Sequence, residues 1–241
     1  MSVHLVGGGW TPAHQPDVFR GFIAEAAERA AAEGAPEPVV ALLLLDPHGR
    51  QENPYLDYYR GAIAAGGGAD VRVTGVSEVD GEFAPAALAG AHGVLVGGGP
   101  TPGYRRAVEP IAGELRRLVA SGSPYLGFSA GAAIAADTAL LGGWRIGGVP
   151  VCQEDAGEDL DEVTVEPGIG LVDLTVEVHA AQWGTLARLI AATEAGLVPG
   201  GVAIDEDTAL IVGDTVRVAG GGSVWRVEAT DRGVLVTTLG A

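Results

Sequence analysis

Apolar runs alternate with amphipathic stretches along the first two-thirds of the chain. Short apolar runs predict strands at residues 3–7, 39–45, 70–76, 93–98 and 124–129. Continuous apolar runs of this length are typical of strands that are covered on both faces. The stretches between them predict helices at 16–35, 54–67 and 101–122, the last with a break at Pro110. This alternation predicts an α/β fold with a doubly wound, mostly parallel sheet flanked by helices.

The last third of the chain has a different pattern. Short strand-like runs follow one another from residue 208 onward, separated by turns such as VGDTV and AGGGSV. Turns rich in Gly and Asp favour hairpins, so we expect an antiparallel C-terminal extension. No linker or internal repeat separates it from the rest of the chain. We therefore predict one domain over residues 1–241.

Residues 142–170 interrupt these patterns with glycine and acidic residues. Seven carboxylates lie between Glu154 and Glu166. A solvated loop explains this composition. The alternative is a lid or rim that presents negative charge to a substrate, because binding residues are often carried on loops.

Composition and charge restrict the classes of partner. The formal net charge is -17, so we expect no nucleic acid and no membrane surface as partner, since both need clustered basic residues. Cys152 is the single cysteine, and no Cys/His cluster has metal-ligand spacing, so we expect no metal and no cofactor. Without a signal peptide or a long apolar run, a soluble cytoplasmic protein is expected. The oligomeric state stays open, and a homodimer is compatible with the sequence.

The stretch GFSAGAA carries the first candidate for chemistry. It places Ser129 between Gly127 and Gly131, after a predicted strand and before a predicted helix at 130–141. Gly-x-Ser-x-Gly in this context is typical of a nucleophile elbow, where bulky neighbours would clash. The free N–H groups of a helix N-terminus favour a developing anion. A serine that merely begins a helix explains the same pattern, so the motif alone leaves both interpretations open.

A serine nucleophile needs a base, and five histidines are available. His179 ends the apolar run 170–179 and precedes a predicted helix at 180–196. Catalytic groups gather at the carboxyl ends of parallel strands, which is where this histidine is expected. His48 also follows a predicted strand and is the alternative. The remaining histidines are expected inside a strand (His4) or on the surface (His14 and His92).

An orienting acid and an oxyanion hole complete such a site. Asp205, Glu206 and Asp207 follow another apolar run, although a simple turn between strands explains them as well. Glycines in the VGGGPT stretch let the backbone approach a substrate closely, and the LVGGG stretch at residues 5–9 repeats this pattern.

In combination these motifs resemble the family of serine peptidases that includes dipeptidase E and cyanophycinase. The fold of that family is similar to that of class I glutamine amidotransferases. The likeness runs nearly end to end and is closer to cyanophycinase in order and spacing. The stretches that carry it are LVGGG, VGGGPT, GFSAGAA, VEVHAAQWGTLARL, GGVAIDEDTALIV and GGGSVWRV.

The resemblance implies a catalytic triad of Ser129, His179 and Glu206. In dipeptidase E the acid lies between the serine and the histidine, which would make Glu154 or Asp155 the acid instead. The oxyanion donors would be the N–H groups of Ala130 and of Gly98 or Gly99. Serine at the elbow, where amidotransferases carry cysteine, argues against glutaminase chemistry.

Some positions depart from the cyanophycinase pattern. Pro100 stands where a glutamine is expected, and Trp183 stands about where an arginine is expected. Arg188 matches a second arginine, which would bind a substrate carboxylate or pair with a helix neighbour. Trp183 would form an apolar wall of the substrate site or simply pack.

We therefore expect a serine hydrolase that cleaves an amide bond in a small or unusual peptide, with aspartyl-linked peptides among the options. The alternatives are a non-catalytic binding or assembly protein with the same fold, and an esterase or acyl transferase that uses the same triad.

Overall fold

A seven-stranded sheet lies at the centre of the computed structural model, which describes residues 2–46 and 53–240. The strand order is β13-β12-β1-β5-β4-β2-β3. Five of these strands run parallel: β1 (Val3–Val6), β2 (Val39–Asp46), β3 (Asp70–Ser77), β4 (Gly93–Val96) and β5 (Tyr125–Phe128). The predicted fold class, with a mostly parallel sheet flanked by helices, is confirmed.

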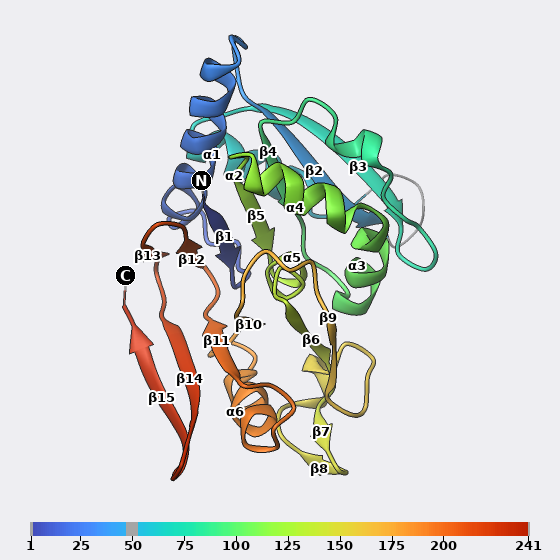
Figure 1. Cartoon of the computed structure of the whole chain (residues 1–241), viewed down its shortest axis with the longest axis vertical. Coiled ribbons are helices and arrows are strands. Elements are labelled where there is room, and N and C mark those ends of the chain that lie inside the picture. Colours follow the sequence, from blue (N-terminus) through green and yellow to red (C-terminus); the bar gives the residue numbers. More distant parts are fainter. Residues whose placement is uncertain (1, 47–52, 241) are drawn as a thin grey trace.

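Helices cover both faces of this sheet (Figure 1). The helices are α1 (Gln15–Ala32) and α2 (Leu56–Gly66) on one face, and α3 (Thr101–Val108) and α4 (Ala112–Ala120) on the other. In β2, Leu42 and Leu44 pack with the first pair, whereas Leu43 and Leu45 pack with the second. Successive side chains of a strand point to opposite faces, which explains why all of β2 is apolar and buried up to Asp46.

The C-terminal strands are antiparallel as predicted, but they are divided between two sheets. β12 (Thr208–Val212) pairs with β1, and β13 (Val216–Gly220) pairs with β12. A second sheet has the order β10-β11-β14-β15. Its strands are β10 (Thr175–Val178), β11 (Gly200–Ile204), β14 (Val224–Thr230) and β15 (Gly233–Leu239).

The two sheets meet at the carboxyl ends of β1, β10 and β11. The Gly7 carbonyl accepts the His179 N–H at 3.0 Å, and the Gly8 carbonyl accepts the Asp207 N–H at 2.7 Å. One apolar cluster contains Leu5 of β1 together with Val176 of β10 and Ile204 of β11. This shared core supports the proposal of a single domain.

The helix expected at 130–141 is much shorter than predicted. α5 (Ala130–Ala133) is one turn long, and β6 (Thr138–Gly142) begins five residues later. The carbonyls of Ile134, Ala135 and Ala136 accept N–H groups from residues 169–171, so pairing with a distant segment replaces the helical hydrogen bonds. Tertiary hydrogen bonds therefore end the helix at Ala133 although the following residues have high helix propensity.

The other predicted helices also have sharper limits than the sequence suggested. The 101–122 stretch is broken by the 3-10 turn η2 (Glu109–Ile111), which contains Pro110 as expected. α6 (Leu186–Glu194) begins well after His179. The acidic 142–170 segment forms short elements: β7 (Arg145–Ile146), β8 (Val149–Pro150), η3 (Glu154–Ala156) and β9 (Thr164–Pro167). Another 3-10 turn, η1 (Pro85–Leu88), lies between β3 and β4.

The predicted surface position of His92 is wrong. His92 was expected at the surface but is 6% exposed, and its Nδ1 accepts the Val39 N–H.

No helix within residues 2–46 and 53–240 is long and apolar enough to cross a membrane.

Candidate active site

Ser129 stands at a sharp turn between β5 and α5. Its backbone has φ 52 and ψ -111, a conformation that L-residues rarely adopt. The two flanking glycines are required by space. A Cβ at Gly127 would lie 2.3 Å from the Gly131 carbonyl oxygen, and one at Gly131 would lie 2.2 Å from the Val96 oxygen. This is the strand-turn-helix geometry that exposes a nucleophile at the end of a strand.

A chain of two hydrogen bonds joins three of the predicted site residues. The Oγ of Ser129 lies 2.8 Å from the Nε2 of His179, and the Nδ1 of His179 lies 2.7 Å from the Oε1 of Glu206. His179 directly follows β10, and Glu206 lies two residues after β11. Parallel pairing of these two strands brings their carboxyl ends together.

The alternative acids do not occupy a position comparable to that of Glu206. Glu154 and Asp155 are exposed and make no ion pair or hydrogen bond with His179. His48 lies outside the described residues.

The carboxylate of Glu206 fixes the tautomer of the imidazole. The hydrogen bond from His179 holds the pKa of Glu206 below its usual range, although partial burial opposes this shift. An ionised carboxylate at Nδ1 favours the proton on that nitrogen, which leaves Nε2 as an acceptor toward the Ser129 hydroxyl. The arrangement can therefore remove a proton from Ser129.

Gly8, in the first glycine stretch, makes room for the histidine. A Cβ at Gly8 would lie 2.2 Å from the Cε1 of His179, and Gly8 has φ +105. Gly9 of the same LVGGG stretch lines the cavity at Ser129, so close backbone approach to a substrate stays a prediction for that residue. Gly8 makes room for the imidazole, because any side chain there would occupy the same space.

The predicted oxyanion donors differ in whether their N–H groups are free. The Gly98 N–H donates to the Tyr59 hydroxyl at 2.7 Å, so it is already engaged. Within the described residues, the N–H groups of Gly99 and Ala130 take part in no hydrogen bond. The N–H groups of Gly99 and Ala130 are therefore the pair that is available to an oxyanion, and the N–H of Gly98 is not.

The hydroxyl of Ser129 opens into a cavity of about 400 Å³. Its wall contains His179, Glu206 and two further carboxylates, Asp155 and Glu158. Aromatic rings make up much of the remaining wall, from Trp10, Tyr55, Tyr59, Phe128 and Trp183. Sequence reasoning missed most of these rings. Trp10 directly follows the LVGGG stretch, which is the one local signal that could have indicated it.

Glu158 brings the acidic 142–170 segment to the cavity. Burial raises the pKa of its carboxyl, and hydrogen bonds from the N–H and hydroxyl of Thr101 oppose the rise. The residue has φ 57, so its backbone is held in the left-handed region. The segment thus supplies two acidic side chains to the wall, Asp155 and Glu158, which fits the rim that the sequence suggested.

Two of the predicted substrate-binding residues lie elsewhere. Pro100 precedes α3 and lines a neighbouring hollow rather than the main cavity. Arg188 is 4% exposed, and its Nε and Nη2 donate to the carboxylate of Glu177 at 2.7 and 2.9 Å. Its Nη1 donates to the carbonyls of Gly143 and Ala156.

Arg188 therefore belongs to the framework of the site, which corrects its predicted role in binding a substrate carboxylate. Glu177 is 2% exposed and needs a counter-charge, because an isolated buried carboxylate is strongly unfavourable. Of the three residues, only Trp183 lies on the wall of the cavity.

Comparison with known proteins supports the fold. No family model matches the chain, and no curated protein matches its sequence. A crystal structure from Listeria monocytogenes EGD-e, described as "a Putative Peptidase E Protein", is similar with a TM-score of 0.53 and 14% identity. The alignment covers 92% of this chain and 98% of that one. The two chains share the fold. The likeness to dipeptidase E thus extends to the architecture, and nothing in it favours cyanophycinase.

Proposed function

We propose that the chain is a serine hydrolase that cleaves amide bonds in small peptides. The observation that carries this proposal is the hydrogen-bonded sequence of Ser129, His179 and Glu206, with the serine on a strained elbow at the edge of a cavity. A nucleophile, a base and an orienting acid at these distances are the requirements for acyl transfer. The shared fold with a peptidase E-like structure is consistent with this reaction.

The mechanism follows from the direction of the hydrogen bonds. The Nε2 of His179 accepts the Ser129 hydroxyl proton while Oγ forms a bond to the substrate carbonyl carbon. The same proton then passes to the leaving nitrogen as the C–N bond breaks, which leaves an acyl ester on Ser129. Water attacks this ester, gives a proton to His179 and releases the acid, and the proton returns to Ser129.

Negative charge on the carbonyl oxygen is stabilised by the free backbone N–H groups at Gly99 and Ala130. Such donors are already oriented before the reaction, so they stabilise the tetrahedral intermediate without reorganisation. Because α5 is a single turn, these individual N–H groups matter more than a long helix dipole.

The charge of the cavity wall favours neutral or cationic peptides. Asp155 and Glu158 lie on the wall, and no arginine among the described residues lines it. A substrate carboxylate would meet like charges there, whereas a cationic group would meet carboxylates and aromatic faces. The aspartyl-linked peptides that the resemblance suggests are therefore expected to be poorer substrates.

A dipeptide panel tests this function. Wild type and Ser129→Ala are incubated with Leu-Ala, Arg-Ala, α-Asp-Ala and β-Asp-Ala, and the released amine is measured. We expect wild type to hydrolyse the leucyl and arginyl dipeptides faster than both aspartyl ones, and Ser129→Ala to be inactive.

Matched esters are assayed in parallel. Hydrolysis of esters alone would replace the peptidase by an esterase. An inactive wild type on every substrate would favour a non-catalytic binding protein.

A further inference from the structure

A tight turn after β10 links the candidate base to the candidate acid. His179 has φ 55, and its carbonyl accepts the Trp183 N–H at 2.9 Å. The Ala181 N–H donates to the Asp205 carboxylate at 3.1 Å, and the side-chain carbonyl of Gln182 accepts the Glu206 N–H at 2.9 Å. The turn is therefore joined at several points to the segment that carries Glu206.

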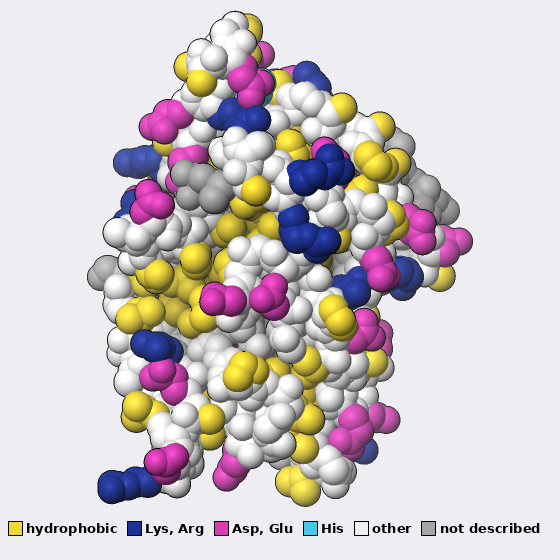
Figure 2. Space-filling view, viewed as in Figure 1, with side chains coloured by type: hydrophobic (Ala, Val, Ile, Leu, Met, Phe, Trp, Pro, Cys, Tyr) yellow, Lys and Arg dark blue, Asp and Glu magenta, His cyan; other side chains and the backbone are white. Residues whose placement is uncertain are grey.

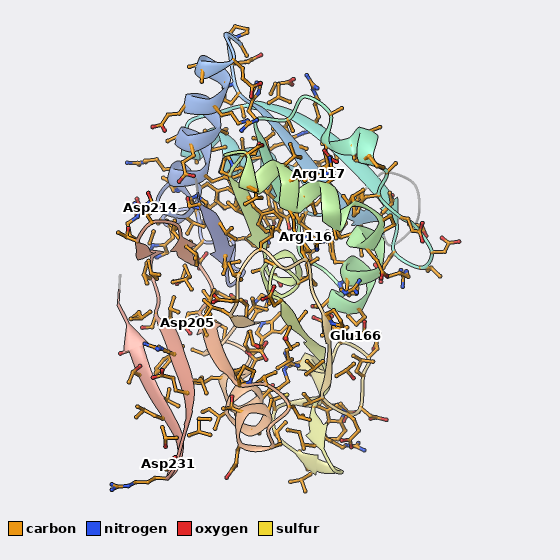
Figure 3. The ribbon with its side chains drawn as sticks, in the orientation of Figure 1. Arg116, Arg117, Glu166, Asp205, Asp214 and Asp231 are labelled. Atoms are coloured by element: carbon orange, nitrogen blue, oxygen red, sulfur yellow. The ribbon has the colours of Figure 1, made fainter. Side chains whose placement is uncertain are left out.

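Asp205 anchors the other side of this junction. Its carboxylate also accepts the Ser223 N–H and the Trp225 indole N–H, both at 2.9 Å. Figure 3 shows Asp205 near the end of β11, where the second sheet approaches the central one. The backbone positions on both sides of the His179–Glu206 hydrogen bond are thus fixed.

Trp183 is folded back by this turn onto the imidazole itself. The two ring centroids are 3.9 Å apart and the planes differ by 7°, so the indole covers one face of His179. Gly8 packs against the Cε1 edge of the same imidazole, because a Cβ on Gly8 would lie within 2.2 Å of that atom. The imidazole therefore has a neighbour on its face as well as partners at both nitrogens.

The same indole lies beside the acid. Trp183 and Glu206 both line the cavity, and Trp183 adds to the effect of His179 in holding the pKa of Glu206 below its usual range. One side chain thus stacks on the base and lies next to its orienting acid. Trp183 lines the cavity and is 42% exposed. Close packing on all sides therefore does not force its indole onto His179.

We infer that Trp183 is a positioning residue of the catalytic machinery rather than only a wall of the substrate site. Its indole holds the plane of His179 in line with Ser129 and Glu206, and its face favours the imidazolium that forms during acyl transfer. This inference rests on the proposed hydrolase function. It assigns a role to a position where the resemblance led us to expect an arginine.

Substitutions that change the stacked ring by degrees test the inference. Trp183→Phe keeps a smaller ring over His179, whereas Trp183→Leu removes the ring. On the best dipeptide substrate we expect Trp183→Leu to lower kcat about 10–100-fold with KM little changed, because misplaced catalytic groups lose rate rather than affinity. Trp183→Phe is expected to fall between this variant and wild type.

Trp144→Leu is the matched control, because Trp144 is partly buried and lies outside the main cavity. It is expected to keep the wild-type kcat and KM. A raised KM with unchanged kcat in Trp183→Leu would overturn the inference and leave Trp183 as a wall. An effect of Trp183→Leu no larger than that of Trp144→Leu would overturn it too.

A spectroscopic measurement separates this inference from the proposed function. The ring protons of His179 are shielded by a stacked indole, so in the NMR spectrum we expect them to move downfield in Trp183→Leu and to stay near their wild-type positions in Trp144→Leu. The shift of the His179 signals is expected even if no dipeptide is hydrolysed, because it depends only on the stacking. Unchanged His179 signals in folded Trp183→Leu would contradict the stacking on which the inference depends.

Discussion

At the scale of single residues, the sequence predicts best what is decided locally. Gly127 is such a case, because a Cβ there would meet the Gly131 carbonyl of the elbow itself, whereas Gly131 is needed by the close approach of Val96 from β4. The purpose of Gly8 was not predictable, since the imidazole that needs its space comes from a residue far along the chain. The same holds for Arg188, whose partner Glu177 is visible in the sequence only as one more acidic residue.

Gly8 supplies a test at this scale. Gly8→Ala would place a methyl group within 2.2 Å of the His179 imidazole, so the ring must move away from Ser129. We expect kcat to fall by about 100-fold or more, measured on the best dipeptide with folding checked by circular dichroism.

Gly61→Ala is the matched control, because a Cβ at that position of α2 would meet no described atom within 4 Å apart from its chain neighbours and the adjacent backbone of its own helix. It is expected to keep full activity and to gain up to about 1 kcal/mol of stability. Wild-type kcat in folded Gly8→Ala would contradict the assigned geometry.

At the scale of elements, hydrophobic patterning predicts the parallel strands well and the helices after Ser129 and His179 poorly. Strands such as β2 are recognisable because both faces are buried, which requires a continuous apolar run. The α5 and α6 segments have high helix propensity but begin or end where backbone groups bond to other parts of the fold. Propensity cannot report such bonds, because the partners are distant in sequence.

The attachment of α6 to β10 gives a prediction at this scale. Arg188 of α6 and Glu177 of β10 form a buried ion pair with side chains 5% and 2% exposed. Arg188→Met leaves a buried carboxylate without its partner, so we expect a loss of about 3–5 kcal/mol in the free energy of unfolding, measured with denaturant.

Arg226→Met breaks the exposed pair with Glu228 and is expected to cost less than about 1 kcal/mol. If Arg188→Met does not fold, the double variant with Glu177→Met is expected to recover much of the stability. Equal losses for the two single arginine variants would contradict the account of the buried pair.

At the scale of the whole molecule, the candidate site exists because two sheets meet. Ser129 follows a strand of the central sheet, whereas His179 and Glu206 follow strands of the second sheet (Figure 1). The sequence indicated antiparallel strands at the C-terminus but not the separate sheet, because strand pairing across the chain leaves no local pattern. The resemblance to a family supplied the grouping of Ser129, His179 and Glu206 that periodicity alone did not.

Charge is also a property of the whole molecule. Figure 2 shows acidic and basic side chains scattered over the viewed face without one dominant basic patch. With a formal net charge of -17, the field around the protein attracts cationic solutes and repels anionic ones. This field and the carboxylates on the cavity wall act in the same direction, which supports the proposed preference for neutral or cationic peptides.

The central claim is that the meeting of the two sheets activates Ser129, and an active-site probe tests it most directly. Wild type, Ser129→Ala and His179→Ala are incubated with a fluorophosphonate, and the adduct is read by intact mass. We expect one adduct on wild type and none on either variant, because only a serine paired with a base attacks phosphorus readily. A folded wild type that stays unlabelled, or a Ser129→Ala variant that is still labelled, would contradict the account.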